Sequence, residues 1–295
     1  MFRKSLPLVS VIMNCHNGET YLKESINSIL SQSYKNFEVI FWDNRSTDNS
    51  ANIFKSFNDK RLKYYYSNRF TTLYEARNHA IKKSNGKFIA FLDADDLWNK
   101  DKLYLQIKKF KKKDVGLVYT NYYSLNQNTG IKRLAYKKKL PEGIVFNELL
   151  KDYFIGINTV IVRRSIMLRE KKIFNKRFNI IGDFDLFMRL SKNIHFASIN
   201  KPIAVYRIHN KNFSKNNYKM YISELKFWLN QQKLISKYNF FYVEETILYL
   251  EAIENISNKK FIFSLKKIFK LFSFKKKIKL LIFFLLKFFS INVKI

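Results

Sequence analysis

The sequence predicts an α/β fold in which helices flank a mostly parallel sheet, followed by a basic helical extension. Short apolar runs alternate with amphipathic segments over the first hundred residues, and this alternation is typical of parallel strands joined by right-handed helical crossovers. The chain has 295 residues and is 47% hydrophobic, which suffices for one large domain and an appendage. From about residue 214 the pattern is helical to the end. We therefore place a boundary near residue 216, between a domain of residues 1–215 and a helical region of residues 216–295.

The elements of the first hundred residues follow from their periodicity. A helix is predicted over residues 19–31, because Leu22, Ile26, Ile29 and Leu30 share one helical face. Further helices are expected at residues 48–57, capped by Ser46 or Thr47, and at residues 73–84. Apolar runs of strand length predict four strands, at residues 8–13, 37–42, 61–67 and 87–92.

The pattern between residues 101 and 213 is more mixed. Helices are expected at residues 101–113, 145–150 and 183–191. A polar turn of hairpin type is expected at residues 126–130. The pattern of residues 177–181 leaves their secondary structure open. Strands are expected at residues 115–124, 159–162, 194–199 and 203–208.

Three carboxylates, Asp93, Asp95 and Asp96, directly follow a strand-length apolar run. Closely spaced like charges repel unless a cation neutralises them. Because Mg²⁺ and Mn²⁺ favour carboxylate oxygens and substrate phosphates, one interpretation is a divalent cation that carries a phosphate. The other is that Asp95 or Asp96 caps the following segment, and this stretch alone favours neither. Asp43 also ends a predicted strand, and it should face the same crevice because parallel strands end at one edge of a sheet.

Several common sites are excluded by the sequence. None of the seven glycines belongs to a G-x-G-x-x-G or a G-x-x-x-x-G-K-[ST] pattern. Cys15 is the only cysteine, so neither a cysteine-histidine zinc site nor an intramolecular disulfide is expected, and a reducing compartment fits. The N-terminus is predicted to be a strand rather than a signal peptide, and no stretch reaches the length of a membrane-spanning helix. The type of site that remains is a metal-dependent site for a nucleoside diphosphate, in which acidic side chains rather than glycines hold the ligand.

Five motifs resemble those of family-2 glycosyltransferases, which are inverting enzymes with a GT-A fold. The family's Asp-Asp-x-Ser-x-Asp pattern appears as DNRSTD at residues 43–48, within an opening segment of similar sequence. EARN at residues 75–78 and DADD at residues 93–96 match its next two motifs. GDFDL at residues 182–186 and YRIH at residues 206–209 match its Glu-Asp-x-Asp-Leu and Tyr-Arg-x-His segments. The order and spacing agree with the family over residues 6–215.

The resemblance implies how the nucleotide would be bound. Asp43 would bind the base, most often uracil, although it is alternatively a cap for the following helix. Asp93 would lie near the ribose and the diphosphate. Arg77 would pair either with a phosphate or with Glu75.

The resemblance also implies the metal ligands and the catalytic base. Asp95 would bind Mn²⁺ or Mg²⁺, and His209 would reach the metal or the diphosphate, or serve the structure alone. Asp183 would be the general base that takes the proton from the acceptor hydroxyl. Its alternative is a carboxylate favoured by the helix dipole at a helix N-terminus. Two residues depart from the family pattern: Asn44 replaces the second Asp of the first motif, and Gly182 replaces the acid before Asp183.

As a function, the resemblance implies transfer of one hexose or N-acetylhexosamine from a nucleoside-diphosphate sugar, with UDP as the expected carrier. The acceptor would be a glycan or a lipid-linked precursor of lipopolysaccharide or capsule, reached from the cytoplasm at the inner face of the membrane. Residues 1–100 would form the nucleotide-sugar half and residues 101–215 the acceptor half. The alternatives are a nucleotidyl- or phosphotransferase using the same acids, and a membrane-binding protein without catalysis.

The last 37 residues are strongly basic within a chain of net charge +32. Residues 259–295 contain eleven lysines and no acid. Phe261, Leu265, Ile268 and Phe272 fall on one helical stripe, and lysines flanking such a stripe suit an anionic membrane surface. The alternative is that these helices simply pack, with their lysines solvated. Nucleic acid is not an expected partner, because no reading-helix motif accompanies the charge.

Overall fold

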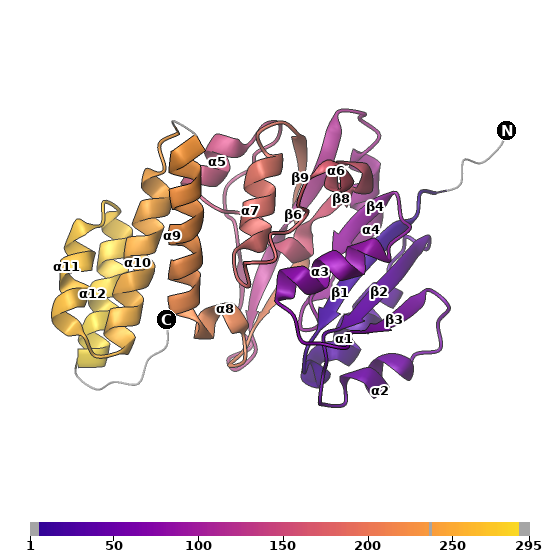
Figure 1. Cartoon of the computed structure of the whole chain (residues 1–295), viewed down its shortest axis with the longest axis horizontal. Coiled ribbons are helices and arrows are strands. Elements are labelled where there is room, and N and C mark those ends of the chain that lie inside the picture. Colours follow the sequence, from indigo (N-terminus) through magenta and orange to yellow (C-terminus); the bar gives the residue numbers. More distant parts are fainter. Residues whose placement is uncertain (1–5, 236–237, 289–295) are drawn as a thin grey trace. The chain divides into compact units, whose positions relative to one another are not determined.

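The computed structural model describes residues 6–235 and 238–288 and divides into two compact units (Figure 1). The first comprises the described residues of Met1–Leu149 and Tyr153–Asn210. The second comprises the described residues of Leu150–Asp152 and Lys211–Ile295. The first unit carries all the motifs found in the sequence.

The first unit begins with the predicted alternation of strands and helices. Its strands lie in the parallel order β3-β2-β1-β4. They are β1 (Val9–Cys15), β2 (Phe37–Asp43), β3 (Leu62–Tyr66) and β4 (Phe88–Phe91). The helices between them are α1 (Glu19–Leu30), α2 (Ser50–Lys55) and α3 (Leu73–Lys82). Only α2 is markedly shorter than predicted, and its N-cap is Asn49 rather than Ser46 or Thr47.

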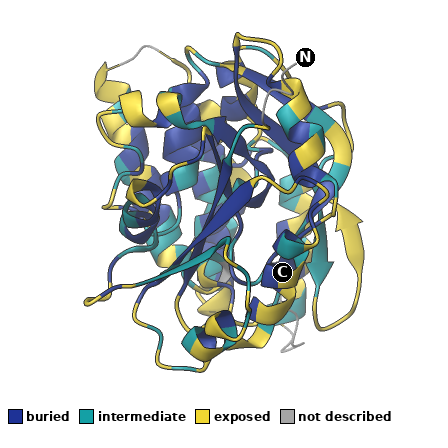
Figure 2. Ribbon diagram, turned by 90° about the vertical axis from the view of Figure 1, so that its right-hand side faces the viewer, coloured by how far each residue is buried: buried dark blue, intermediate teal, exposed yellow. Residues whose placement is uncertain are grey.

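Helices cover both faces of this part of the sheet. Every residue of β1 and β4 is buried, as expected of parallel strands that are covered on both sides. Val11 on β1 packs in one cluster with Leu22 and Ile26 of α1, whereas α3 contacts β1 and β2 and buries Ala76 and Ala80. Figure 2 shows the resulting buried strands at the centre of the fold. The predicted α/β class is confirmed.

The second half of the sheet is mixed. Strand β8 (Ile161–Arg163) pairs antiparallel with β4 and with β6 (Val115–Asn126), while β6 runs parallel to β9 (His195–Ile208). The predicted turn at residues 126–130 connects β6 to the short antiparallel strand β7 (Lys132–Leu134). The long parallel pairs β1–β2 and β6–β9 keep the sheet mostly parallel.

One strand replaces two in this half. The sequence predicts separate strands at residues 194–199 and 203–208, but the structure has the single strand β9, with a register shift between Ile199 and Pro202. Proline has no N–H to donate to a ladder, so the pairing is interrupted there while the strand continues. Four short elements of this half were not predicted: the strands β5 (Leu97–Trp98) and β7, and the helices α6 (Arg164–Arg169) and η1 (Ile157–Thr159). The remaining elements of this half are α4 (Lys102–Lys109), α5 (Phe146–Lys151) and α7 (Gly182–Leu190).

The second unit is helical, as predicted from residue 214 onward. It contains α8 (Phe213–Asn216), α9 (Tyr218–Ile235), α10 (Phe241–Ser257), α11 (Phe261–Lys270) and α12 (Phe274–Phe288). Its own core includes Ile253, Ile256, Ile268, Leu280 and Phe283. In the described part of the chain, no helix has the length and apolar character needed to cross a membrane.

The predicted apolar stripe of the tail is largely used for packing inside this unit. Ile268 is fully buried in the core of the second unit, and Leu265 packs against it. Phe272, by contrast, follows the end of α11 and is exposed. Residues 289–295 of the predicted basic tail lie outside the described residues.

Candidate active site

The carboxyl ends of β2 and β4 meet at one edge of the sheet, on either side of β1. Cys15 at the end of β1 is paired with Asp43, and Ile12 is paired with Phe91 of β4, two residues before Asp93. The acids at residues 43 and 93–96 therefore lie at the same edge, as the parallel arrangement predicted.

The three acids that follow β4 have three different environments. Asp93 Oδ1 accepts a 2.5 Å hydrogen bond from Nη2 of the buried Arg77. Asp95 Oδ2 lies 2.9 Å from His209 Nε2. Asp96 is buried, and its carboxyl accepts bonds from the Arg207 N–H and from Asn158 Nδ2. Burial, with the negative charges of Asp95 and Asp93, raises the pKa of the Asp96 carboxyl well above its ordinary value.

Asp96 therefore serves the fold, while Asp93 and Asp95 remain accessible. The side chains of Asp93 and Asp95 are 32% and 31% exposed. Asp96 does not act as the cap that was considered for it; its carboxyl joins Asn158 of η1 to Arg207 of β9. The accessible acids are Asp93 and Asp95, which the sequence analysis expected to face a nucleotide and a cation.

Asp95 and His209, the two predicted metal ligands, are brought together across 114 residues. Arg207 holds this arrangement in place: its Nε donates to the Asp95 carbonyl at 2.7 Å, and its Nη2 reaches Glu24 at 2.8 Å. Its guanidinium also lies 4.4 Å from the ring centroid of Tyr21, which contacts His209. Arg207 belongs to the YRIH motif at residues 206–209, but the sequence analysis predicted no role for it.

The Asp95–His209 pair fits a divalent cation whose remaining ligands come from the substrate. Among residues 6–235 and 238–288, no three His, Cys, Asp or Glu side chains form a ready-made metal site. Mg²⁺ is commonly held by one or two carboxylates together with substrate phosphates and water. One accessible carboxylate oxygen beside one imidazole nitrogen is a partial ligand set of this kind.

Asp43 is buried at the end of β2, with both carboxylate oxygens engaged. Its Oδ1 accepts from the Ser46 N–H and its Oδ2 from the Tyr64 hydroxyl, each at 2.7 Å. Burial and this bond to Asp43 raise the pKa of Tyr64. The carboxylate thus orders the loop after β2 but does not cap α2, whose N-cap is Asn49. Any contact with a base uses its remaining lone pairs.

The Asn44 departure from the family pattern has a structural reason. Asn44 is buried and its Nδ2 donates to the Thr71 carbonyl, while its Oδ1 accepts from the Thr71 N–H and hydroxyl. A carboxylate at this position could accept but not donate. The amide therefore joins the loop after β2 to the segment that precedes α3.

Asp183 lies at the N-terminus of α7 between two tyrosine hydroxyls. Tyr74 of α3 donates to Oδ1 at 2.7 Å, and Tyr153 donates to Oδ2 at 3.2 Å. Burial raises the pKa of Asp183, and the Tyr74 bond and the charge of Arg77 oppose that rise. The sequence did not identify either tyrosine; Tyr74 directly precedes the EARN motif, whereas nothing in the sequence marks Tyr153.

The same tyrosine explains the second departure, Gly182. A Cβ added at Gly182 would lie 2.5 Å from the ring carbons Cγ and Cδ2 of Tyr74. Real Cβ atoms do not approach a neighbour this closely, so the family's acid has no room at this position while Tyr74 keeps its place. Gly182 and Tyr74 are therefore a matched pair beside Asp183.

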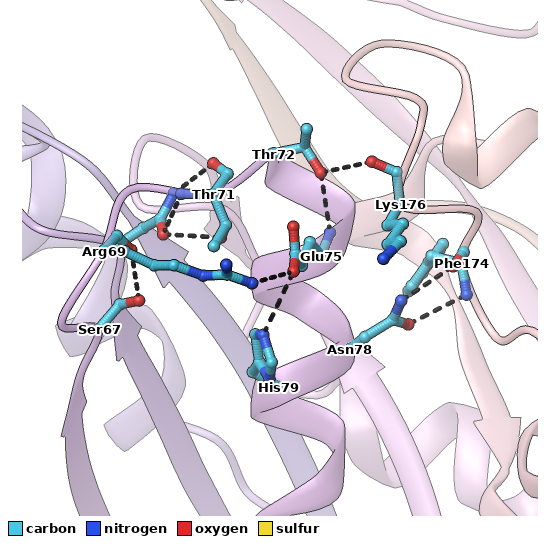
Figure 3. Close-up of polar contacts among 10 residues, drawn as sticks. Ser67, Arg69, Thr71, Thr72, Glu75, Asn78, His79, Phe174 and Lys176 are labelled. Atoms are coloured by element: carbon cyan, nitrogen blue, oxygen red, sulfur yellow. Dashed lines mark hydrogen bonds and ion pairs between the residues drawn. The ribbon is translucent and has the colours of Figure 1, made fainter.

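Arg77 links the two groups of acids. It pairs with Asp93 rather than Glu75, and its guanidinium lies 5.0 Å from the ring centroid of Tyr74. Glu75 instead binds Arg69 at 2.9 Å (Figure 3). The site therefore combines the half-buried carboxylate of Asp183, whose pKa is raised, with the buried guanidinium of Arg77. Its two accessible acids are Asp93 and Asp95, and Asp95 lies beside the imidazole of His209.

Comparisons with known proteins agree with this arrangement. Residues 10–178 match the family model of glycosyl transferase family 2. Over 214 residues the chain is 34% identical to the Escherichia coli UDP-Glc:alpha-D-GlcNAc-diphosphoundecaprenol beta-1,3-glucosyltransferase WfgD, covering 72% of this chain and 81% of that protein. It is 32% identical over 222 residues to WfaP of Escherichia coli, which has the same description, with 74% and 84% covered.

Solved structures show the fold. S. aureus TarS in complex with UDP-GlcNAc superposes with a TM-score of 0.61 at 18% identity, over 95% of this chain and 81% of TarS. The mannosyltransferase PcManGT from Pyrobaculum calidifontis, in complex with GDP-Man and Mn²⁺, superposes with a TM-score of 0.59 at 16% identity. The match covers 90% of this chain and 75% of PcManGT. The family match and the two relatives confirm the resemblance found in the sequence: the chain belongs to glycosyl transferase family 2 and is a glycosyltransferase.

Proposed function

We propose that this glycosyltransferase moves one sugar from a nucleoside-diphosphate sugar to a lipid-linked or glycan acceptor, with inversion at the anomeric carbon and with a divalent cation. The observation that carries the proposal is the constellation of Asp183, Arg77–Asp93 and Asp95–His209 at one side of the sheet. A UDP-sugar is the proposed donor and a hexose or N-acetylhexosamine the proposed sugar, because WfgD and WfaP are described as using UDP-Glc.

The donor would be held by the edge of the sheet in residues 1–100. Asp43 would contact the base, and Asp93 with Arg77 would face the ribose and the diphosphate. Asp95 and His209 would hold Mn²⁺ or Mg²⁺, which when bound neutralises the charge that develops on the departing diphosphate. Arg207 would keep Asp95 and His209 at the spacing that they need, because it fixes the Asp95 carbonyl.

Asp183 would act as the general base in the acceptor half, residues 101–215. The acceptor oxygen forms the new bond to the anomeric carbon, the bond from that carbon to the diphosphate oxygen breaks, and the acceptor proton moves to Asp183. A base needs a pKa close enough to the working pH to accept a proton while remaining ionised beforehand. Burial raises the pKa of Asp183, and the hydroxyls of Tyr74 and Tyr153 orient both of its oxygens.

The proposed setting is the cytoplasmic face of the membrane, in the assembly of bacterial surface polysaccharides such as lipopolysaccharide or capsule. Support comes from WfgD, whose described acceptor is a sugar on diphosphoundecaprenol, a lipid carrier. We propose that the second unit binds the anionic membrane surface through the described part of residues 259–295. Phe274, Ile278 and Ile282 are exposed along α12, next to the exposed Lys275 and Lys279, and such a face suits the interface of an anionic bilayer.

Calorimetric titration of UDP, with GDP and dTDP as controls, tests the donor and the metal. We expect UDP to bind in the presence of Mn²⁺ and not to bind detectably to the Asp95→Ala variant. Binding of a different nucleotide would change the donor class, and binding of none by the folded protein would reject the catalytic proposal. Release of pyrophosphate instead of UDP during turnover would identify a nucleotidyltransferase.

A further inference from the structure

A second concave surface lies on the other side of α3 from Arg77. This groove has a volume of about 990 Å³ and is lined by residues 69–72, by one face of α3, and by residues 168–179 except Arg169 and Phe178. Glu75, Asn78 and Lys82 supply the face of α3, since residues three, four and seven apart share one side of a helix. Arg77 points instead to Asp93 at the edge of the sheet.

The groove is built into the fold rather than formed by a loose loop. The Thr72 hydroxyl donates to the Lys176 carbonyl at 2.8 Å, and the Leu73 N–H donates to Asn179 at 2.9 Å. Asn78 exchanges two hydrogen bonds with the backbone of Phe174, at 2.8 and 3.0 Å (Figure 3). Both walls are therefore held at a set separation before any ligand arrives.

The acids of the groove already have cationic partners. Glu75 pairs with Arg69, and Glu170 pairs with Arg189. Four exposed lysines remain on its walls, and none of them forms an ion pair with any residue of the described chain: Lys82, Lys171, Lys172 and Lys176. Because the whole protein is basic, lysine content alone would not mark this surface. Its distinction is that these unpaired cations line a preformed hollow, where they concentrate positive potential.

Two further features suggest what the cations face. Phe70 and Leu168 in the lining are 59% and 50% exposed, so the groove offers apolar surface beside its lysines. The chain segment that forms the wall with Lys176 and Asn179 leads directly to Asp183. Within this segment, the Ile180 carbonyl accepts a hydrogen bond from the Tyr74 hydroxyl at 3.0 Å. The groove therefore lies beside the segment that leads to the proposed base, while Asp183 itself is not part of the lining.

We propose that this groove binds the diphosphate of a lipid-linked sugar acceptor, with Lys171, Lys172 and Lys176 on the phosphates and Phe70 and Leu168 on the start of the lipid chain. The assignment of the occupant rests on the proposed function. Phosphate oxygens are the partners that ammonium groups bind as point charges, and no donor phosphate is needed there, since Arg77, Asp95 and His209 lie at the sheet edge.

Titration of inorganic pyrophosphate into the full chain tests the groove directly. The measurement is made without divalent cations, so that the cation-dependent donor site proposed above takes up neither nucleotide nor pyrophosphate. The variant Lys171→Ser/Lys172→Ser/Lys176→Ser should bind roughly tenfold more weakly, because each exposed charge contact contributes a few-fold. The matched control is Lys111→Ser/Lys112→Ser/Lys113→Ser, three exposed lysines outside the groove, which should stay within about twofold of wild type. Equal weakening of both variants, or no binding by wild type, overturns the site.

Steady-state kinetics then test the occupant. With a prenyl-diphosphate-linked N-acetylhexosamine as acceptor, the groove variant should raise the acceptor KM about tenfold and leave the donor KM and kcat unchanged. An unchanged acceptor KM would reject the acceptor diphosphate even if pyrophosphate binding is lost. If wild type transfers no sugar, the proposed function fails, and the pyrophosphate titration still decides whether the groove is an anion site.

Discussion

The acidic edge of the first unit and the surface of α11 and α12 in the second unit handle charge in opposite ways. At the edge, Asp93 is paired with Arg77, Asp95 with His209, and Asp96 with buried donors. On α11 and α12 the exposed lysines at positions 266, 270, 275 and 279 form no ion pair within the described residues. Large apolar side chains are exposed between them, nine from Ile262 to Phe288.

This difference indicates two kinds of function. A charge with one partner at hydrogen-bond distance has a set position and, when buried, an altered pKa, so a single substitution should change chemistry. Solvated charges act through their sum, and each contributes little. Substitutions in the first unit should therefore have large and specific effects, and those on α12 small and additive ones.

The largest effect is expected for Asp183→Asn, which keeps the shape of the side chain but removes the base. We expect kcat to fall by about 10³, because general base catalysis contributes roughly 10²–10⁴. UDP affinity, measured by calorimetry, should stay unchanged. A near-normal rate would assign Asp183 to the helix N-terminus alone.

Next in size is the effect of Asp96→Ala on stability. The substitution leaves the Arg207 N–H and Asn158 Nδ2 without their acceptors, and unsatisfied buried donors cost about 1–3 kcal/mol each. We expect urea denaturation to show a loss of about 3 kcal/mol in the free energy of unfolding. In the control Asp95→Ala, the removed side chain is 31% exposed and the loss should be less than about 1 kcal/mol. Equal losses would show that the acids do not differ in role.

Gly182→Ala should cost about 2 kcal/mol of unfolding free energy, since the new Cβ would overlap the Tyr74 ring and overpacking typically costs about 1–3 kcal/mol. A double-mutant cycle with Tyr74→Ala tests the cause. If Gly182→Ala costs as much in the Tyr74→Ala background, the two residues are not a matched pair.

Tyr74→Phe keeps the ring and removes the hydroxyl that donates to Asp183. That bond favours the ionised carboxylate and so lowers its pKa; its loss should raise the pKa further. Because the base must be ionised, the acid limb of the pH–rate profile should move to higher pH. At pH 7 we expect kcat to fall about tenfold, the value of one hydrogen bond to a charged group. An unmoved acid limb would mean that Tyr74 only packs against Gly182.

The smallest effect is expected for Ile282→Ser on α12. Sedimentation with anionic phosphatidylglycerol vesicles should show binding weakened about fivefold, corresponding to roughly 1 kcal/mol of lost apolar contact. Ile131→Ser is the control, because Ile131 is 49% exposed and Ile282 is 54% exposed. Equal binding by both variants would leave the α12 face without a role at the membrane.

Much of the framework could be predicted from local patterns. The alternation of residues 8–92 predicted four strands and three helices, and parallel topology then placed Asp43 and Asp93 at one edge. The helical character after residue 214 was also predicted. The tail was interpreted less fully: periodicity identified an apolar stripe with Ile268, but could not tell whether neighbouring helices cover it, as they do.

By itself, the sequence determined the α/β class, the family, and the acids at the strand ends, because periodicity and short motifs are properties of neighbouring residues. Only the tertiary structure decided that Asp96 is buried while Asp95 meets His209, that Tyr74 fills the space above Gly182 and orients Asp183, and that Arg77 binds Asp93. These pairs are 16 to 114 residues apart in the chain. Their distances depend on how separate elements pack, and that packing also sets each group's burial and pKa.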